Sequence, residues 1–284
     1  MSVLSTEQIT SRVASSVREK VNVADDALRA DAIGVFQQLG LPELKHEEYK
    51  YTPIARYLEK NFTFTPSDAP GPLENVNEFL INGLEANVLV FIDGAYSIDH
   101  SRLISPDIRV VQLEEALAAK DKVALAHFSK YVNYKADALA AWNTAGWNNG
   151  LFVHIPDGKV VEQPIVIYQL SNATAGEIVA VNRNLFVIGN DSQATIVEKH
   201  GSTGNANHFS NLVTEVVLLE NARLDLFFIQ DDTGNRFHYG LTEVYQQRSS
   251  FLNTYTFSLR GKLLRNNLHL QLDGEGIESH MYGL

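Results

Sequence analysis

Adjacent carboxylates in the second half of the sequence are the first candidates for chemistry. Asp231 and Asp232 follow a strand-like run, and paired carboxylates can serve in acid–base catalysis or in calcium binding. Neighbouring residues of a strand point in opposite directions, however, and aspartate is common in turns. We therefore interpret this pair as turn residues.

Three histidines form a second candidate group. His200, His208 and His238 lie on successive predicted strands or in their loops, and they could converge if those strands stack. A metal site needs ligands around one point and further groups that orient the imidazoles. We favour surface or core histidines over such a site.

Two more clusters precede the strands. Trp142 and Trp147 flank a helix-to-strand junction, and their large burial areas favour core packing and docking of the two halves. Residues 46–51, His-Glu-Glu-Tyr-Lys-Tyr, are dense in polar and aromatic groups. They could form a partner surface, but we favour a solvated helix face.

The composition excludes several chemistries. The 284 residues include no cysteine, which excludes disulfides, thiol nucleophiles, thiolate zinc sites and an iron–sulfur cluster held by four thiolates. No P-loop, G-x-G-x-x-G, H-E-x-x-H or G-x-S-x-G motif occurs. A net charge of −11 without a basic stripe argues against nucleic acid as a partner.

The apolar runs are short, as at residues 88–92, whereas a bilayer span needs roughly 20 apolar residues. We therefore expect no membrane protein. Residues 1–30 lack the apolar core of a signal peptide. Together with the lack of disulfides, this favours the cytoplasm.

Residues 1–62 predict helices. Apolar residues at helical spacing form one stripe, which Gly40 ends: Ala24, Leu28, Ala32, Val35, Phe36 and Leu39. A later helix is expected to have Thr52 as N-cap and Pro53 as its first residue. Residues 65–72 are rich in proline and predict a linker or an extended loop.

A mixed segment follows the helices. Residues 88–92 and 108–113 predict strands, and Asp93-Gly94 predicts a hairpin turn. Residues 114–131 predict one helix with acidic groups in its first turn. Residues 136–142 predict a shorter helix.

From residue 150 onward the pattern is strand after strand. Strands are predicted at residues 151–155, 164–170, 184–188, 194–199, 212–219, 224–230, 237–245, 251–259 and 263–272. Turn signals begin at 189, 220, 248 and 273, in steps of 31, 28 and 25 residues. Such steps favour a solenoid or β-helix over a sandwich, which would turn every ~8–12 residues. Leu224, Leu226 and Phe228 share a face, so each wall should have one buried and one wet face.

We therefore expect a mainly β protein. Residues 1–148 should form an α-helical and mixed α/β region, and residues 149–284 a parallel β-solenoid. The sequence stops at Met281-Tyr282-Gly283-Leu284, inside the strand pattern. A solenoid normally needs a polar cap, so we expect this one to be incomplete at its C-terminal end, either as a fragment or under another chain.

Three stretches resemble the SufD proteins of the SufB/SufD family. Residues 41–53, Leu-Pro-Glu-Leu-Lys-His-Glu-Glu-Tyr-Lys-Tyr-Thr-Pro, are similar to their N-terminal signature. Residues 140–156 with the following Pro164-Ile165, and residues 273–284, are similar to two further motifs. The resemblance covers essentially the whole chain. It implies a helical N-terminal region, a right-handed parallel β-helix and a C-terminally truncated SufD.

The resemblance also implies a function. The chain would be a non-catalytic subunit in iron–sulfur cluster assembly, pairing with a SufB-like paralogue and a SufC-like ATPase. A cluster would be present only transiently in the full complex, and this chain would bind no cofactor. The lack of cysteine fits SufD better than SufB, whose scaffold role depends on a thiolate.

The family continues beyond this length with more β-helix, a C-terminal helical segment and a histidine near the cluster-building interface. No position here matches that histidine, so we assign no catalytic, cofactor-binding or metal residue. Two alternatives stay open. One is a carbohydrate-active β-helix enzyme, and Asp231-Asp232 is the only sequence feature that supports it. The other is a purely structural solenoid that assembles with itself, for example as a homodimer.

Overall fold

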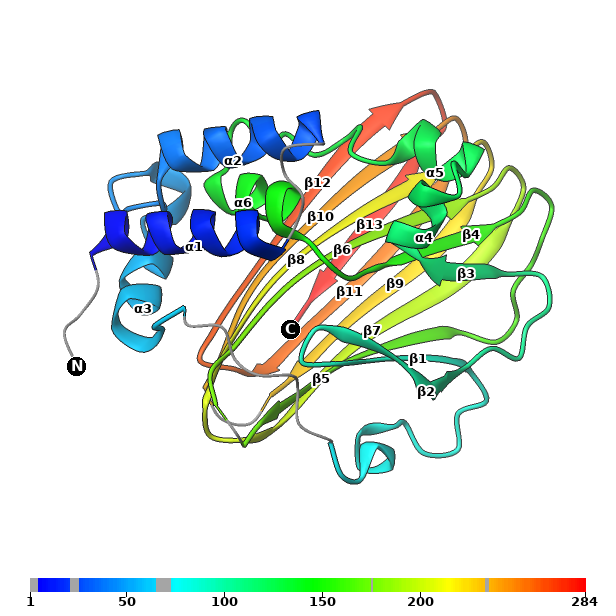
Figure 1. The fold of residues 1–284 in the computed structure, drawn as a ribbon. Coiled ribbons are helices and arrows are strands. Elements are labelled where there is room, and N and C mark those ends of the chain that lie inside the picture. Colours follow the sequence, from blue (N-terminus) through cyan, green and yellow to red (C-terminus); the bar gives the residue numbers. More distant parts are fainter. Residues whose placement is uncertain (1–4, 21–25, 65–72, 175, 233–234) are drawn as a thin grey trace.

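A computed structural model describes residues 5–20, 26–64, 73–174, 176–232 and 235–284 (Figure 1). Ala24 and the linker predicted at 65–72 lie outside these residues. The helices of the described chain all precede the long strands. They are α1 (Thr6–Lys20), α2 (Ala27–Leu39), α3 (Ile54–Asn61), α4 (Leu113–Ala118), α5 (Lys122–His127) and α6 (Ala138–Gly146), with 3-10 turns η2 (Glu47–Tyr49) and η3 (Val76–Phe79).

Helix α2 confirms part of the predicted stripe. Asp26 caps its start by accepting hydrogen bonds from two backbone N–H groups, and Gly40 ends it at a left-handed φ of 65°. Ala32 and Phe36 are buried, whereas Leu39 is 40% exposed. The stripe is wrong at Leu39 because the buried face of α2 ends at Phe36, and the residues after it, Gln37, Gln38 and Leu39, are exposed.

Two helix predictions need correction. Thr52 is not the N-cap of α3, because Pro53 occupies that position and makes no side-chain cap. The single helix predicted at residues 114–131 is two short helices, α4 and α5. The helix is interrupted at Lys120, which has a left-handed φ of 53°. Asp121 is the N-cap of α5, and its carboxylate accepts a hydrogen bond from the N–H of Ala124 at 2.8 Å.

The strands form two sheets. Sheet A has the order β13-β11-β9-β7-β5-β1-β2, and sheet B has the order β12-β10-β8-β6-β4-β3. The strands are β1 (Asn87–Ile92), β2 (Ala95–Arg102), β3 (Arg109–Gln112), β4 (Leu151–Ile155), β5 (Ile165–Ala173), β6 (Ile178–Ile188), β7 (Gln193–Gly204), β8 (Asn207–Leu218), β9 (Arg223–Asp231), β10 (Asn235–Gln247), β11 (Phe251–Arg260), β12 (Leu263–Asp273) and β13 (Glu278–Gly283).

From β4 onward the chain alternates between the sheets, and every pair within a sheet is parallel, which confirms the predicted parallel β-helix (Figure 1). On β7, β9, β11 and β13 of sheet A, the residues that lie side by side in register include Gln193, Arg223, Phe251 and Glu278. They are 30, 28 and 27 residues apart in the sequence. The predicted steps were therefore close. Sequence reasoning missed β2 and β13.

The predicted boundary between the N-terminal region and the β-solenoid, between residues 148 and 149, stays a prediction. Strands that precede it in the sequence nevertheless belong to the two sheets of the β-helix. β1 pairs in parallel with β5, and β3 pairs in antiparallel with β4. The turn predicted at Asp93-Gly94 joins β1 to β2, with left-handed φ values at both residues.

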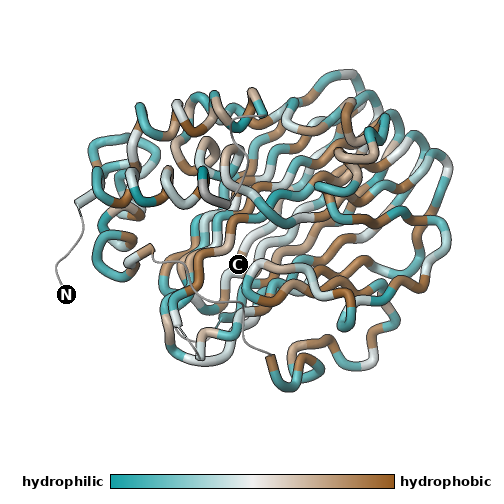
Figure 2. The backbone as a smooth tube through the Cα atoms, in the orientation of Figure 1, coloured by the Kyte–Doolittle hydropathy of each residue, from teal (hydrophilic) through white to brown (hydrophobic). Residues whose placement is uncertain are grey.

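The expected wet face is wrong for the first rungs, because β5, β6 and β8 are buried on both faces. Inside the solenoid, residues such as Ile196 and Leu224 form one core. Outside sheet B, α6 lies on β6 and β8, and α2 packs on α6, which together bury outward residues such as Val213. The segment with η3 covers Val166 on sheet A. Figure 2 shows the resulting hydrophobic bands across neighbouring strands.

A buried ion pair anchors the helical layer to sheet B. Arg183 of β6 and Glu215 of β8 lie 2.8 Å apart with fully buried side chains. The same carboxylate accepts hydrogen bonds from the backbone N–H groups of Ser129 at 2.9 Å and Tyr131 at 3.1 Å. The segment that follows α5 is thereby held on the outer face of the sheet.

Candidate functional site

Trp142 and Trp147 pack in the core, as predicted. Both side chains are at most 3% exposed. The Trp142 ring stacks on Phe209 of β8, and Trp147 lies under the guanidinium of Arg29 at 4.4 Å. Trp142 therefore joins the helical layer to the solenoid, whereas Trp147 packs within the helical layer, against Arg29 and Phe128.

The segment 46–51 is only partly the solvated face that we favoured. Tyr51 is 87% exposed, but Tyr49 is buried and its hydroxyl donates a hydrogen bond to Asp137. Burial and the Asp137 carboxylate raise the pKa of Tyr49 well above its ordinary value. Arg265 of β12 lies 4.1 Å above the Tyr49 ring and donates a hydrogen bond to the backbone oxygen of Glu48 at 2.7 Å.

Asp231 and Asp232 do not form a carboxylate pair. Asp231 lies at the surface in an ion pair with Arg260, whose hydrogen bond lowers the pKa of that carboxyl. Asp232 is 2% exposed and faces the interior, with one oxygen 3.8 Å from Nε of Arg236. Asp231 is the last residue of β9 rather than a turn residue, and the two side chains diverge as neighbouring strand residues do. This divergence removes the geometry that paired acid–base catalysis needs.

The three histidines do converge, inside the β-helix. His200 of β7, His208 of β8 and His238 of β10 are at most 3% exposed. The rings of His200 and His238 meet edge to face with their centroids 4.8 Å apart. They are core histidines, as favoured, but they lie in a polar part of the lumen rather than among apolar side chains.

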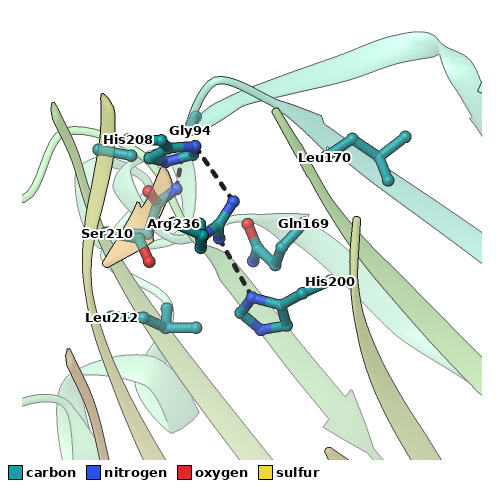
Figure 3. Close-up of a pocket in the computed structure, with 10 residues that line it drawn as sticks. Gly94, Gln169, Leu170, His200, His208, Ser210, Leu212 and Arg236 are labelled. Atoms are coloured by element: carbon teal, nitrogen blue, oxygen red, sulfur yellow. Dashed lines mark hydrogen bonds between the residues drawn. The ribbon is translucent and has the colours of Figure 1, made fainter. Parts of the chain in front are cut away.

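Arg236 connects two of these rings. Its guanidinium lies 3.1 Å from Nδ1 of His208 and 3.1 Å from Nδ1 of His200 (Figure 3). Because a guanidinium has only donors, both Nδ1 atoms must accept, which places the proton of each ring on Nε2. Nε2 of His200 then donates to Glu198 at 2.6 Å.

The surroundings keep His208 and His238 neutral. Burial, followed by the charge of Arg236, lowers the pKa of His208 well below its ordinary value. Burial, followed by the neighbouring His200, does the same for the pKa of His238, whose Nδ1 lies 2.7 Å from Oγ of Ser210. The lumen thus contains two neutral imidazoles, those of His208 and His238, beside the Arg236 guanidinium and the Asp232 carboxylate.

Two small cavities adjoin this network. One, of about 10 Å³, is bordered by Gln169, Asn182, His208, Ser210 and Arg236 among others. The other, of about 30 Å³, lies further along the lumen, between Glu198 and His238 and the Asn266 side chain of β12. These volumes admit one or a few water-sized occupants.

The geometry does not favour a metal centre. Within the described residues, no three His, Asp or Glu side chains are placed to hold a metal ion. The Nδ1 atoms of His200 and His208 already face the Arg236 guanidinium. The prediction that the chain provides no catalytic, cofactor or metal residues stays a prediction.

Sequence reasoning missed Arg236, Glu198 and Gln169. One signal was available: each lies at an inward position of its strand, in alternation with residues that face outward. Charged residues at such positions are unusual and mark a polar interior.

Comparison with known families gives matches along nearly the whole chain. The family described as "SufBD protein N-terminal region" matches residues 9–167, more than half of the sequence. The chain belongs to the SufB/SufD family. A second description, "SUF system FeS cluster assembly, SufBD core domain", matches residues 170–284, which contain most of the β-helix.

Individual members of the SufB/SufD family show the same relationship. The chain is 26% identical over 265 residues to the iron–sulfur cluster assembly SufBD family protein slr0076 of Synechocystis, covering 90% of this chain and 58% of that protein. It is 23% identical over 239 residues to SufD of Escherichia coli, covering 83% and 53%.

SufB of Bacillus subtilis is a more partial match, 22% identical over 167 residues, covering 57% of this chain and 35% of that protein. The chain spans slightly more than half the length of slr0076 and of SufD of Escherichia coli. Among the described residues, no helix combines the length and the hydropathy that crossing a bilayer requires.

Proposed function

We propose that the chain acts as a non-catalytic, SufD-like subunit of an iron–sulfur cluster assembly complex. Its partners would be a SufB-like paralogue and a SufC-like ATPase, and its compartment the cytoplasm. Membership of the SufB/SufD family supports the assembly role. Because thiolates are the usual ligands of iron–sulfur clusters, a partner would have to provide them.

The observation that carries the SufD-like assignment is the absence of cysteine from all 284 residues, combined with matches to both SufBD domains. A subunit of this composition can shape and support a cluster site but offers it no thiolate. The separation of Asp231 from Asp232 supports this proposal over a carbohydrate-active enzyme, since glycosidases need two carboxylates facing one substrate.

Co-purification tests the proposal. The full-length protein, a cysteine-containing paralogue and the ATPase from the same organism are mixed and separated by gel filtration. We expect one peak that contains all three chains, with the ATPase alone as the control for non-specific association. Elution of the protein apart from both partners, or only as an assembly of itself, would contradict the proposal.

Cluster loading gives a second, independent readout. The 284-residue chain alone, incubated anaerobically with ferrous iron and sulfide, should show no stable cluster absorbance after desalting. The paralogue treated in the same way should retain a cluster. A stable cluster on this cysteine-free chain alone would show that it is itself a scaffold.

A further inference from the structure

Asparagine and aspartate residues that precede a glycine share one kind of reactivity. Because glycine has no Cβ, its backbone nitrogen can approach the preceding side chain and attack the carbonyl carbon Cγ. The sequence contains Asn-Gly pairs at 82–83 and 149–150, and Asp-Gly pairs at 93–94, 157–158 and 273–274. The surroundings of these pairs differ, so the fold determines which of them can react.

The Asn82-Gly83 pair lies in an exposed turn between η3 and β1 (Figure 1). Gly83 has a left-handed φ of 74°, and no atom lies within 4 Å of the position that a Cβ would take. The N–H of Leu84 donates to the backbone oxygen of Ile81 at 3.4 Å, which is long for such a bond. Among the described residues, neither the Asn82 side chain nor the Gly83 N–H has a hydrogen-bond partner. Both reacting groups are therefore free, in a turn that opens easily.

The Asn149-Gly150 pair has the same sequence but is enclosed. The backbone oxygen of Asn149 accepts a hydrogen bond from the N–H of Arg183 at 2.9 Å, and that of Gly150 accepts one from the N–H of Leu113 at 2.9 Å. A Cβ at Gly150 would lie 1.6 Å from the backbone oxygen of Arg183. Rotation of this peptide would break hydrogen bonds and collide with β6, so the folded structure protects the pair.

The Asp-Gly pairs are held by hydrogen bonds as well. Their carboxylates accept, in chain order, from the N–H of Asn172 at 2.7 Å, from the N–H of Asn190 at 2.8 Å and from the hydroxyl of Tyr245. The N–H of Gly158, which would have to attack in the second pair, donates to the backbone oxygen of Asn190 at 2.7 Å. The structure therefore leaves Asn82 as the residue that is free to react.

We propose that Asn82 is a modification site, at which the folded chain converts to isoaspartate and aspartate. The backbone nitrogen of Gly83 loses its proton to the solvent and attacks Cγ of Asn82. A bond forms between these two atoms, the bond from Cγ to the side-chain nitrogen breaks, and that nitrogen takes up a proton and leaves as ammonia. One water then opens the resulting succinimide at either carbonyl, which gives aspartate or an isoaspartate whose main chain runs through Cβ. The reaction consumes only water.

The fold also limits the consequence of this modification. On one side of the turn, the N–H of Ile81 donates to the Tyr168 hydroxyl at 2.9 Å. On the other side, the buried side chain of Asn87 donates to Ser105 at 2.9 Å. Isoaspartate adds one carbon to the main chain and one negative charge between these fixed points, so the exposed residues 82–85 must accommodate both. The site is independent of the proposed assembly function.

Peptide mapping by mass spectrometry tests the proposal in the folded 284-residue chain, kept at pH 8 and 37 °C. The peptide with Asn82 should gain about 1 Da and appear as two products, aspartate and isoaspartate, that elute separately. The peptide with Asn149 should react at least about tenfold more slowly, because its surroundings must first unfold locally. In urea the two peptides should react at similar rates.

Three results of this experiment would overturn the proposal. Equal rates for Asn82 and Asn149 in the folded chain would show that the fold does not select the site. An Asn82 that reacts in urea but not in the folded chain would show that the turn is too rigid. Aspartate without isoaspartate would show direct hydrolysis of the side chain rather than attack by Gly83.

A matched pair of variants locates the new charge. Asn82→Gln and Asn77→Gln both replace an exposed asparagine of the same segment, but Asn77 precedes a glutamate. Glutamine would have to close a six-membered ring, which forms more slowly. Asn82→Gln should therefore remove the acidic species that isoelectric focusing detects in the aged protein, and Asn77→Gln should leave it in place. Persistence of that species in Asn82→Gln would show that the charge arises elsewhere.

Discussion

Arg183 and Glu215 face each other across neighbouring strands at 2.8 Å, and neither side chain has any contact with solvent. Removing one partner of such a pair leaves the other charge buried and uncompensated. We expect Glu215→Gln to lower the free energy of unfolding by about 3–5 kcal/mol, measured by urea denaturation.

The exposed pair of Arg248 and Glu220 is the matched control, with side chains 63% and 42% exposed. Glu220→Gln should cost at most about 1 kcal/mol, because water screens both charges. Equal costs in the two variants would show that burial does not control the strength of these pairs.

Asp137 connects α6, the segment with Tyr49 and strand β10, so its replacement should lower the free energy of unfolding. It caps α6 by accepting from the N–H of Ala140 at 2.9 Å, and it accepts from the hydroxyls of Tyr49 and Tyr239. We expect Asp137→Ala to destabilise the protein by about 2–4 kcal/mol, as the cap is lost and two buried hydroxyls lose their acceptor.

Asp26 caps α2 but bonds to no tyrosine, so Asp26→Ala isolates the contribution of a cap. Its expected cost in the same urea experiment is about 1 kcal/mol. If Asp137→Ala costs no more than this, the tyrosine hydrogen bonds contribute nothing to stability.

Stability should fall below about pH 6.5, because burial holds the pKa values of His208 and His238 well below the ordinary value. The unfolded chain then binds protons that the folded protein does not. Each histidine therefore removes about 1.4 kcal/mol of stability per pH unit below that point, and none above it.

Urea midpoints between pH 8 and 5 measure this dependence, and imidazole NMR shifts identify the residues responsible. Both rings should stay neutral down to the pH of unfolding. His46→Gln, which removes an exposed ring, is the control and should leave the slope unchanged. A flat profile from pH 7.5 to 5.5 would contradict the prediction.

Two glycines should respond oppositely to alanine. A Cβ at Gly150 would lie 1.6 Å from the backbone oxygen of Arg183, whereas Gly34, in α2, has no atom within 4 Å of that position. Gly150→Ala should cost about 4 kcal/mol or more, because the backbone of β6 must move. Gly34→Ala should stabilise the protein by about 0.5–1 kcal/mol, and thermal unfolding distinguishes the two signs.

Features set by neighbouring residues could be predicted from the sequence. The Asp93-Gly94 turn follows from two residues that tolerate left-handed backbone angles, and Gly40 ends α2 for a similar reason. The regular spacing of the turn signals predicted the β-helix, because each rung of a β-helix brings the chain back to the same edge.

The interior network could not be predicted with the same means. His208 and Arg236 meet because their strands are offset by 28 residues, whereas an error of one residue in register turns every side chain to the other face. The predicted steps differed from the observed ones by up to two residues. The packing of α6 on β6 and β8 could not be predicted either, because no local sequence pattern indicates which helix packs on which sheet.

The hydrogen bond from Arg265 to Glu48 joins residues 217 positions apart. On a ribosome, the segment around Tyr49 must therefore wait until Arg265 has been synthesised before this contact can form. Such remote contacts slow folding and leave apolar surface exposed in the meantime. The segment around Tyr49 should accordingly reach its final packing later than the strands of the first rungs, although it precedes them in the sequence.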